Sequence, residues 1–448
     1  MIVTYNSIIN LFSKLQDNKK AEHYLNELIQ KYDAIGDEAL RPNTVSFNAC
    51  LSSFSRAKTQ EEAQRCETIF HQMQERACSE DNDLRPDAFT MTNIIAAWGN
   101  SNNPERAEAL LNKMQTLYEQ GDDEMKPTTV SFGSVLHAWS RRGDVSRAEA
   151  IVAHMEKLMN VEGNEEMRPN TVIYNTLINC HAKSRKPDAA QKAEIIFAKM
   201  KQFKRDGILS SSPSIITYNT ILSALHSDSR NNYTKAKDIL REMEEESTID
   251  PSIRPETITF TTFLKILAGA NEPKKSLIAE GIINRMEENL DDLKLRPNNL
   301  TYDAVLKVCK FPVSKSNKVR RHAFVLAIKT LSMMQKLPHI KATSFTYAEF
   351  FSVIGRLKSN DEEYCKLVEK SFESCCEAGV LNDRILGILI NTTPQNLLKK
   401  LFRTEHVVKS VSMLPPNWSY NSKYGISNES ERVQERSIHN TGRSRIKR

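Results

Sequence analysis

The sequence repeats one short phrase at a nearly constant interval. Its clearest copy is RPNTVIYNTLI from Arg168, and related phrases begin at Arg41, Arg85, Lys126, Ser212, Arg254, Arg296 and Lys341, while Met1–Asn6 matches the middle of the phrase. One marker position is spaced by 41 to 45 residues along the chain and is occupied by Tyr5, Phe47, Met91, Phe132, Tyr174, Tyr218, Phe260, Tyr302 and Tyr347. Such self-similarity indicates about nine stacked repeats, numbered 1 to 9 here, that share a continuous core.

Each repeat is expected to contain two antiparallel helices. In repeat 5, Asn170 and Thr171 follow a proline and suit the start of a helix, and a second apolar stripe at helical spacing indicates another helix from about residue 189 to about 203. A small residue followed seven positions later by Leu or Met marks the second helix: Ala21/Leu28, Cys66/Met73, Ala107/Met114, Ala148/Met155, Ala193/Met200, Ala236/Met243, Ala279/Met286 and Ala327/Met334. The predicted fold is all-α, a right-handed α-solenoid of stacked helix-turn-helix repeats.

The pattern divides the chain into three segments. Residues 1–383 are expected to form the repeat array, 384–420 a capping helix (386–402) and turn, and 421–448 a basic, disordered tail. The net charge is +6, and the stretch from Glu431 to Arg448 contributes most of it, so any basic surface on the array must be local. No apolar run is long enough to span a membrane. The N-terminus, which begins inside a repeat, is expected to be incomplete.

The sequence lacks motifs for metal or cofactor chemistry. The eight cysteines form no Cys-x-x-Cys pair and are interpreted as buried, reduced thiols. His137, His181 and His226, near the ends of first helices, are interpreted as structural. No cofactor, no metal and no enzymatic activity are therefore predicted.

The repeated phrase, the paired helices, the Ala-x6-Met marker and the closing Arg/Lys-Pro resemble the pentatricopeptide repeat family over residues 1–383. The family's common unit has 35 residues, and these longer units resemble those of some algal members. The resemblance implies sequence-selective binding of single-stranded RNA, one base per repeat, in organellar RNA processing, stability or translation.

By this resemblance, the second residue of each repeat stacks on a base. These residues are Val3, Val45, Phe89, Val130, Val172, Ile216, Ile258 and Leu300, with Phe345 in repeat 9. The alternative is that they pack in the core.

The resemblance also assigns base choice to the fifth residue of a repeat and the last residue before the next one, both on the concave surface. The pairs are Asn6/Asn43, Asn48/Asp87, Thr92/Thr128, Gly133/Asn170, Asn175/Ser214, Asn219/Glu256, Thr261/Asn298, Asp303/Thr343 and Ala348/Asp383. Asn with Asp implies U, Asn with Asn or Ser implies a pyrimidine, and Thr with Asn implies A; the other pairs stay unassigned. Helix N-capping is an alternative role for the last residue.

Cations at position 13 could reach the RNA backbone, as the family implies: Lys14, Arg56, Arg141, Lys183 and Arg356. The alternative is that they are ordinary cations near helix C-termini. The expected partner is single-stranded RNA, with a protein such as a nuclease as a further candidate. A monomer in a mitochondrion or plastid is expected, with the cytosol less favoured. The competing function is a protein-binding scaffold, although one peptide groove gives no reason for the apolar-second, polar-fifth pattern to recur.

Overall fold

The structure is a computed structural model that describes residues 1–79, 84–184, 186–310, 316–356, 362–404, 406 and 408–422. The chain divides into an N-terminal unit, Met1–Ser227, and a C-terminal unit, Asp228–Arg448. This division falls inside repeat 6, between its two helices. Most of the predicted tail lies outside the described residues, and the predicted boundaries at 383 and 420 stay a prediction.

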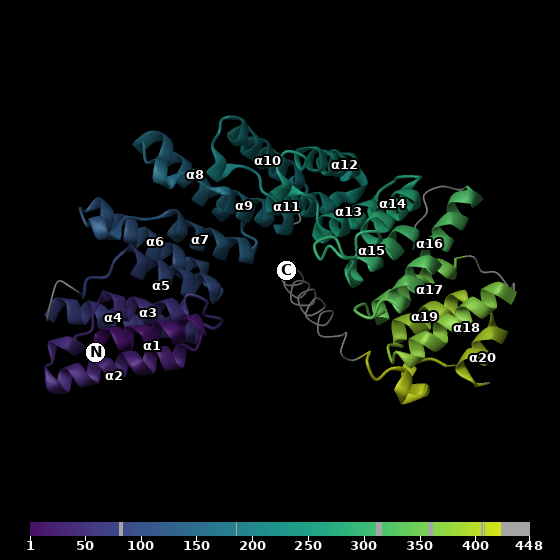
Figure 1. The fold of residues 1–448 in the computed structure, drawn as a ribbon, viewed down its shortest axis with the longest axis horizontal. Helices are drawn as coiled ribbons and strands as arrows, with labels where there is room; N and C mark the ends of the chain where they lie inside the picture. Colours follow the sequence, from purple (N-terminus) through teal and green to yellow (C-terminus); the bar gives the residue numbers. More distant parts are fainter. Residues whose placement is uncertain are drawn as a thin grey trace, which may run out of the picture. The chain divides into compact units, whose positions relative to one another are not determined.

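The N-terminal unit is a series of helical hairpins (Figure 1). Its helices are α1 (Ile2–Lys14), α2 (Asn18–Ile35), α3 (Thr44–Phe54), α4 (Gln60–Ser79), α5 (Ala88–Asn100), α6 (Pro104–Glu119), α7 (Thr129–Arg142), α8 (Val145–Glu162), α9 (Thr171–Ser184), α10 (Ala189–Arg205) and α11 (Ile215–Leu225). The first helices of neighbouring repeats pack on one another in the order α1, α3, α5, α7, α9, α11. They form one continuous layer, which the second helices cover.

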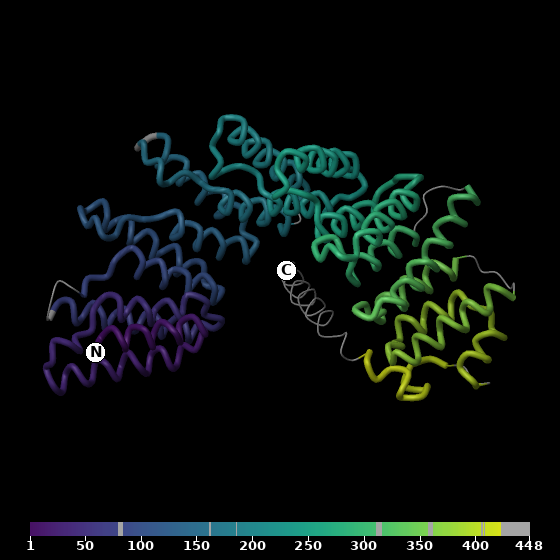
Figure 2. The backbone as a smooth tube through the Cα atoms, viewed as in Figure 1, coloured from purple at the N-terminus to yellow at the C-terminus, as the bar shows by residue number. Residues whose placement is uncertain are grey.

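The C-terminal unit continues the same pattern, and its hairpins can be followed along the backbone in Figure 2. Its helices are α12 (Ser229–Glu246), α13 (Thr257–Gly269), α14 (Lys275–Glu287), α15 (Asn299–Lys310), α16 (Asn317–Lys336), α17 (Ser344–Ile354), α18 (Glu362–Glu377), α19 (Asp383–Thr392) and α20 (Gln395–Phe402). Helices α13, α15, α17 and α19 pack successively, so α19 extends the first-helix layer. The predicted fold class, an all-α solenoid of helical hairpins, is confirmed.

The seven-residue marker of the second helices forms the core of the stack. Both members of every pair from Ala21/Leu28 to Ala327/Met334 are 0% exposed. The small residue lets helices approach closely, and the flexible thioether of Met fills the remaining irregular space. The burial predicted from the spacing is therefore confirmed throughout the array.

The extra length of the repeats is organised differently from the prediction of an extended helix and a polar loop. The second helices do run past the marker, but short 3₁₀ turns follow them at Glu38–Leu40, Asp123–Met125, Glu165–Met167 and Pro251–Ile253. The last residue of each of these turns is buried. The loop is thus anchored to the core directly before the Arg/Lys-Pro pair.

Two further expectations need correction. The predicted capping helix over residues 386–402 is two helices, α19 and α20, because Pro394 cannot donate the backbone hydrogen bond of a continuous helix. All eight cysteines are free thiols, as expected, but Cys78 is exposed and Cys365 is only half-buried.

Among the described residues, no cluster of His, Cys, Asp and Glu could hold a metal ion, and no helix has the length and hydropathy of a membrane span.

Candidate nucleic-acid interface

Eight apolar residues stand exposed on the first-helix layer, one in each of repeats 1 to 8. Their exposed fractions lie between 55% and 74%, and the residues are Val3, Val45, Phe89, Val130, Val172, Ile216, Ile258 and Leu300. We call this set the apolar ladder. Core packing was the alternative for these side chains, and their exposure excludes it.

Helix geometry explains why the second residue is exposed while its neighbours are not. Each first helix of repeats 2 to 9 begins at the residue directly after the closing cap residue. The third residue of the repeat faces the preceding repeat and the fourth enters the core, as with Ser46 and Phe47, which are both 0% exposed. Because successive helical residues are rotated by about 100°, the second residue points away from both.

Repeat 9 departs from the ladder because its second residue already has partners. Phe345 is half-buried, with Lys307 Nζ 4.9 Å and Arg384 Cζ 5.4 Å from the ring centroid. Arg384 of α19 also bonds to the buried carboxylate of Glu349, which Lys310 contacts as well. The second residue of repeat 9 is therefore partly covered by Lys307 and Arg384.

The fifth residue of repeat 2 meets the closing residue and the next repeat in a hydrogen-bonded group. Asn48 Nδ2 lies 3.3 Å from Asp87 Oδ1, and Thr90 Oγ1 lies 2.7 Å from both Asn48 Oδ1 and Asp87 Oδ1. Asp87 also accepts from the Thr90 backbone N–H and so caps α5. The closing residue thus caps a helix and contacts the fifth residue at the same time.

Repeat 1 has the same arrangement with an amide in place of the carboxylate. Ser46 Oγ donates to Asn6 Oδ1 at 2.7 Å and lies 3.1 Å from Asn43 Oδ1. Asn6 Nδ2 lies 3.5 Å from Asn43 Oδ1. A hydroxyl of the next repeat therefore fixes which edge of the Asn6 amide points outward.

In repeats 7 and 8 the predicted pairs meet only through this hydroxyl. Thr261 Oγ1 lies 2.8 Å from Thr301 Oγ1, which is 3.1 Å from Asn298 Oδ1. In repeat 8, Thr346 Oγ1 donates to Asp303 Oδ1 at 2.8 Å and lies 3.2 Å from Thr343 Oγ1. Burial raises the pKa of Asp303 to about 6, although the Thr346 hydrogen bond opposes the shift.

The described residues of repeats 3 and 5 do not form such a group. Thr92 donates to the Ala88 carbonyl of its own helix. The Oδ1 atom of Asn175 is buried without a hydrogen-bond partner among the described residues. Ser214 caps α11 instead of meeting Asn175. Asn219 and Glu256 belong to different units, which are described separately.

Sequence reasoning missed the third residue of the repeat. It is a 0% exposed hydroxyl in seven repeats: Ser46, Thr90, Ser131, Thr217, Thr259, Thr301 and Thr346. The recurring Ser or Thr was visible in the repeated phrase, but a buried hydroxyl reveals its partners only in three dimensions. Repeat 5 has Ile173 at this position.

The predicted backbone-binding cations are exposed. Lys14, Arg56, Arg141, Lys183 and Arg356 all lie at or just beyond the C-terminal ends of first helices. Arg141 donates to the Asn100 carbonyl, at the C-terminal end of α5 in the preceding repeat, at 2.7 Å, which is a structural contact. Both roles can coexist, since one guanidinium has several donors.

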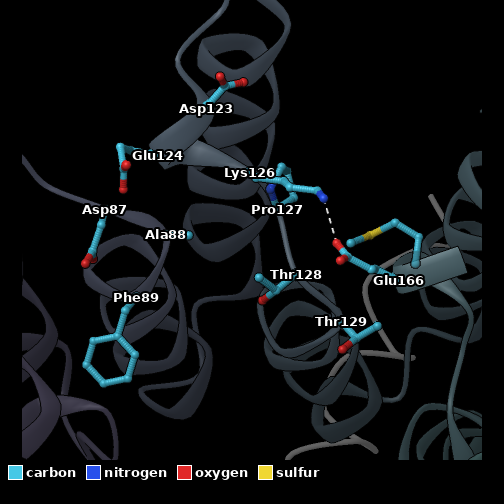
Figure 3. A pocket seen from close by; sticks show the side chains of 11 residues that line it. Asp87, Ala88, Phe89, Asp123, Glu124, Lys126, Pro127, Thr128, Thr129 and Glu166 are labelled. Carbon is cyan, nitrogen blue, oxygen red and sulfur yellow. Dashed lines mark hydrogen bonds and ion pairs between the residues drawn. The ribbon is translucent and has the colours of Figure 1, made fainter. Parts of the chain in front are cut away.

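Near the N-termini of α5 and α7, one hollow is lined mainly by carboxylates. A hollow of about 430 Å³ there is lined by Asp87, Asp123, Glu124 and Glu166 together with Lys126, whose Nζ lies 2.6 Å from Glu166 (Figure 3). Its excess of carboxylates makes this hollow unfavourable for a phosphate group.

Comparisons with known proteins agree with this architecture. The family model described as pentatricopeptide repeat domain matches residues 115–183, 158–227 and 238–310, and the one described as PPR repeat matches 3–32 and 89–117. Together the matches span more than half of the chain. No curated protein matches the sequence.

Solved structures with a similar fold include the pentatricopeptide repeat protein PPR10 from maize, at 16% identity and a TM-score of 0.46, covering 98% of this chain and 59% of that one. The same protein in complex with an 18-nt psaJ RNA element matches at 16% identity and a TM-score of 0.38, covering 90% of this chain and 60% of that one. The chain thus spans about 60% of the length of PPR10. From its matched repeats, the chain belongs to the pentatricopeptide repeat family.

Proposed function

We propose that this chain binds single-stranded RNA, with successive bases held against the apolar ladder, one per repeat. The observation that carries this proposal is the exposure of all eight ladder residues, between 55% and 74%. Exposed apolar side chains cost free energy in water, and burying them against a ligand recovers it. Every base has an apolar face, so a ladder of this kind binds a strand without choosing its sequence.

Selectivity is assigned to the polar groups beside the ladder. The amide of Asn48 and the carboxylate of Asp87 are held by the buried hydroxyl of Thr90, so their donors and acceptors have fixed directions. Fixed groups discriminate between bases because a mismatched edge leaves one of them unpaired. The proposed readout, from 5′ to 3′, is pyrimidine at repeat 1, U at repeat 2, pyrimidine at repeat 5 and A at repeat 7.

The position-13 cations would neutralise phosphates along this strand. Lys14 and Lys183 are exposed near the C-terminal ends of α1 and α9, so their charge is accessible to a polyanion. With a net charge of only +6, the chain must rely on such local cations.

For the cellular role, we propose that a monomer acts on organellar transcripts by occupying a single-stranded segment. Occupancy alone can block exonucleases, prevent a hairpin or present the RNA to a partner nuclease. This role needs no catalytic residue, metal or cofactor in the chain itself.

Selection from a randomised single-stranded RNA library with the purified chain tests the proposal. The expected result is an enriched motif with U at the base opposite repeat 2 and A five bases downstream, and weaker binding at higher salt. Enrichment of no RNA, together with capture of a peptide on the ladder, would favour a protein-binding scaffold instead.

A further inference from the structure

We call the space beside the ladder residue of a repeat, next to its fifth residue and its closing residue, the slot of that repeat. The slot of repeat 4 differs from those of repeats 1, 2, 7 and 8. A hollow of about 370 Å³ lies between two ladder residues, Val130 and Val172, and Gly133, Asn170 and Ile173 also line it. Gly133 is the fifth residue of repeat 4, the position from which Asn48 and Asn6 are expected to reach a base edge. The hollow therefore lies where the proposed function places the fourth base, and the inference below rests on that function.

Both polar groups that order the other slots are absent here. Gly133 has no side chain, and the buried hydroxyl of the following repeat is replaced by Ile173, which is 2% exposed. A Cβ at position 133 would lie only 3.2 Å from Ile173 Cδ1. The missing side chain at Gly133 therefore leaves the room that the larger side chain of Ile173 occupies. Positions 133 and 173 therefore offer no hydrogen-bonding side chain, whereas the matching positions of repeat 1 carry Asn6 and Ser46.

The one predicted edge-reading group left in the slot is Asn170, and half of its amide is already used. Asn170 Oδ1 accepts from the backbone N–H groups of Val172 and Ile173, at 3.0 and 3.1 Å, and caps α9. The Nδ2 group remains, and it can only donate. Each of the four bases offers an acceptor on its edge, so a single donor discriminates poorly between them.

His137, for which the sequence predicts a structural role, also lines this hollow. Packing against neighbouring residues removes part of the hydration of this exposed ring and lowers its pKa, and the positive charges of Arg141 and Lys183 lower it further. The ring is therefore neutral at pH 7, with one nitrogen that donates and one that accepts. Because the two tautomers exchange these roles, the ring adapts to a base and does not select one.

We propose that the slot of repeat 4 accepts any of the four bases, purines included, and holds them by stacking between Val130 and Val172. The RNA motif of this protein then has a fixed, non-selective position two bases 3′ of the U assigned to repeat 2. The volume of the hollow suits this, since pockets of about 300 Å³ or more take ligands at least as large as a purine.

Binding to four RNAs that differ only at the fourth base of the selected motif tests this inference. Wild-type affinities are expected to agree within about 3-fold, since no bidentate contact is available. The variant G133N/I173S copies the group formed by Asn6, Asn43 and Ser46 in repeat 1, with Asn170 in the role of Asn43. We expect it to prefer a pyrimidine at this base by about 10-fold, with the rest of the motif unchanged.

A control variant, I173V, removes one methylene and adds no hydrogen-bonding group, so its fourth position should stay non-selective. Circular dichroism shows whether each variant keeps its helical content. The wild-type affinities for the four RNAs test the non-selectivity of repeat 4 even if a variant fails to fold. Selection of a single base at this position by the wild type, within an otherwise intact motif, would overturn the inference and leave the proposed function standing. Failure to enrich any RNA would overturn both.

Discussion

Replacing Thr90 with valine tests the buried hydroxyl that joins repeats 2 and 3. The substitution keeps the shape of the side chain and removes only its hydrogen-bonding capacity. Thr90 is 0% exposed, and its Oγ1 accepts from the Asp87 backbone N–H at 3.1 Å while it lies 2.7 Å from Asn48 Oδ1 and Asp87 Oδ1. The capping bond from the Thr90 backbone N–H to Asp87 is retained.

The cost follows from the groups left without a partner. The Asp87 N–H and the Asn48 Oδ1 each lose a bond worth about 1 kcal/mol, and the Asn48 acceptor is poorly reached by water. A loss of about 2 kcal/mol in local stability is expected, which corresponds to roughly 30-fold faster hydrogen exchange of the amides in the first turn of α5. The same change should weaken the preference for U, because the Asn48 amide is then held only by its bond to Asp87 and its Oδ1 loses the Thr90 hydroxyl.

Hydrogen exchange followed by mass spectrometry over α5 measures this effect on the intact chain. A matched control is Thr116→Val on α6, where an exposed hydroxyl donates only to the Asn112 carbonyl of its own helix. The control should change local stability by less than about 0.5 kcal/mol. Equal protection of α5 in wild type and T90V would refute the role assigned to the hydroxyl.

Three further substitutions probe the ladder and the C-terminal unit. Phe89→Ala should lower RNA affinity by about 5- to 150-fold at little cost in stability, whereas Ile195→Ala, which removes an equally exposed apolar side chain from α10, should leave affinity unchanged in filter binding. Asp303 has its pKa raised to about 6, so the folded state binds more protons than the unfolded state between that value and about 4. Urea unfolding midpoints of the wild type should therefore rise as the pH falls through 6, and Asp303→Asn should remove this rise. Glu349→Gln breaks a buried group of ion pairs and should destabilise the C-terminal unit by about 3 kcal/mol, seen as a lower urea midpoint at pH 7.

The repeat spacing was sufficient to predict the fold because it constrains the core directly. The pair Ala193/Met200 recurs at the same place in eight repeats, and every such residue is fully buried. The starts of the first helices of repeats 2 to 8 could also be predicted, since Asn170 and its counterparts there follow a proline and occupy the N-cap position. The 3₁₀ turn that ends at Met167 could not be predicted, because a single apolar residue in a polar loop gives no periodic signal.

The sequence predicted which positions form the candidate site, but not whether they are exposed or which residues of the next repeat they contact. The recurring apolar second residue could not be assigned to core or surface by spacing alone, and the exposure of Val172 decided between them. The hydroxyl of Thr90 and the altered slot around Gly133 depend on contacts between repeats, about 40 residues apart in the chain. Contacts at that separation leave no local pattern in a single sequence.

The central claim is that successive repeats present successive bases with fixed polar groups beside the ladder. The most direct measurement is RNA selection with the double variant Asn48→Thr and Asp87→Asn, which copies the group of Thr261, Asn298 and Thr301 in repeat 7 and keeps a good N-cap on α5. The account predicts a change from U to A at the base opposite repeat 2 and no change elsewhere in the motif. A motif identical to that of the wild type, or one altered at several distant bases, would contradict it.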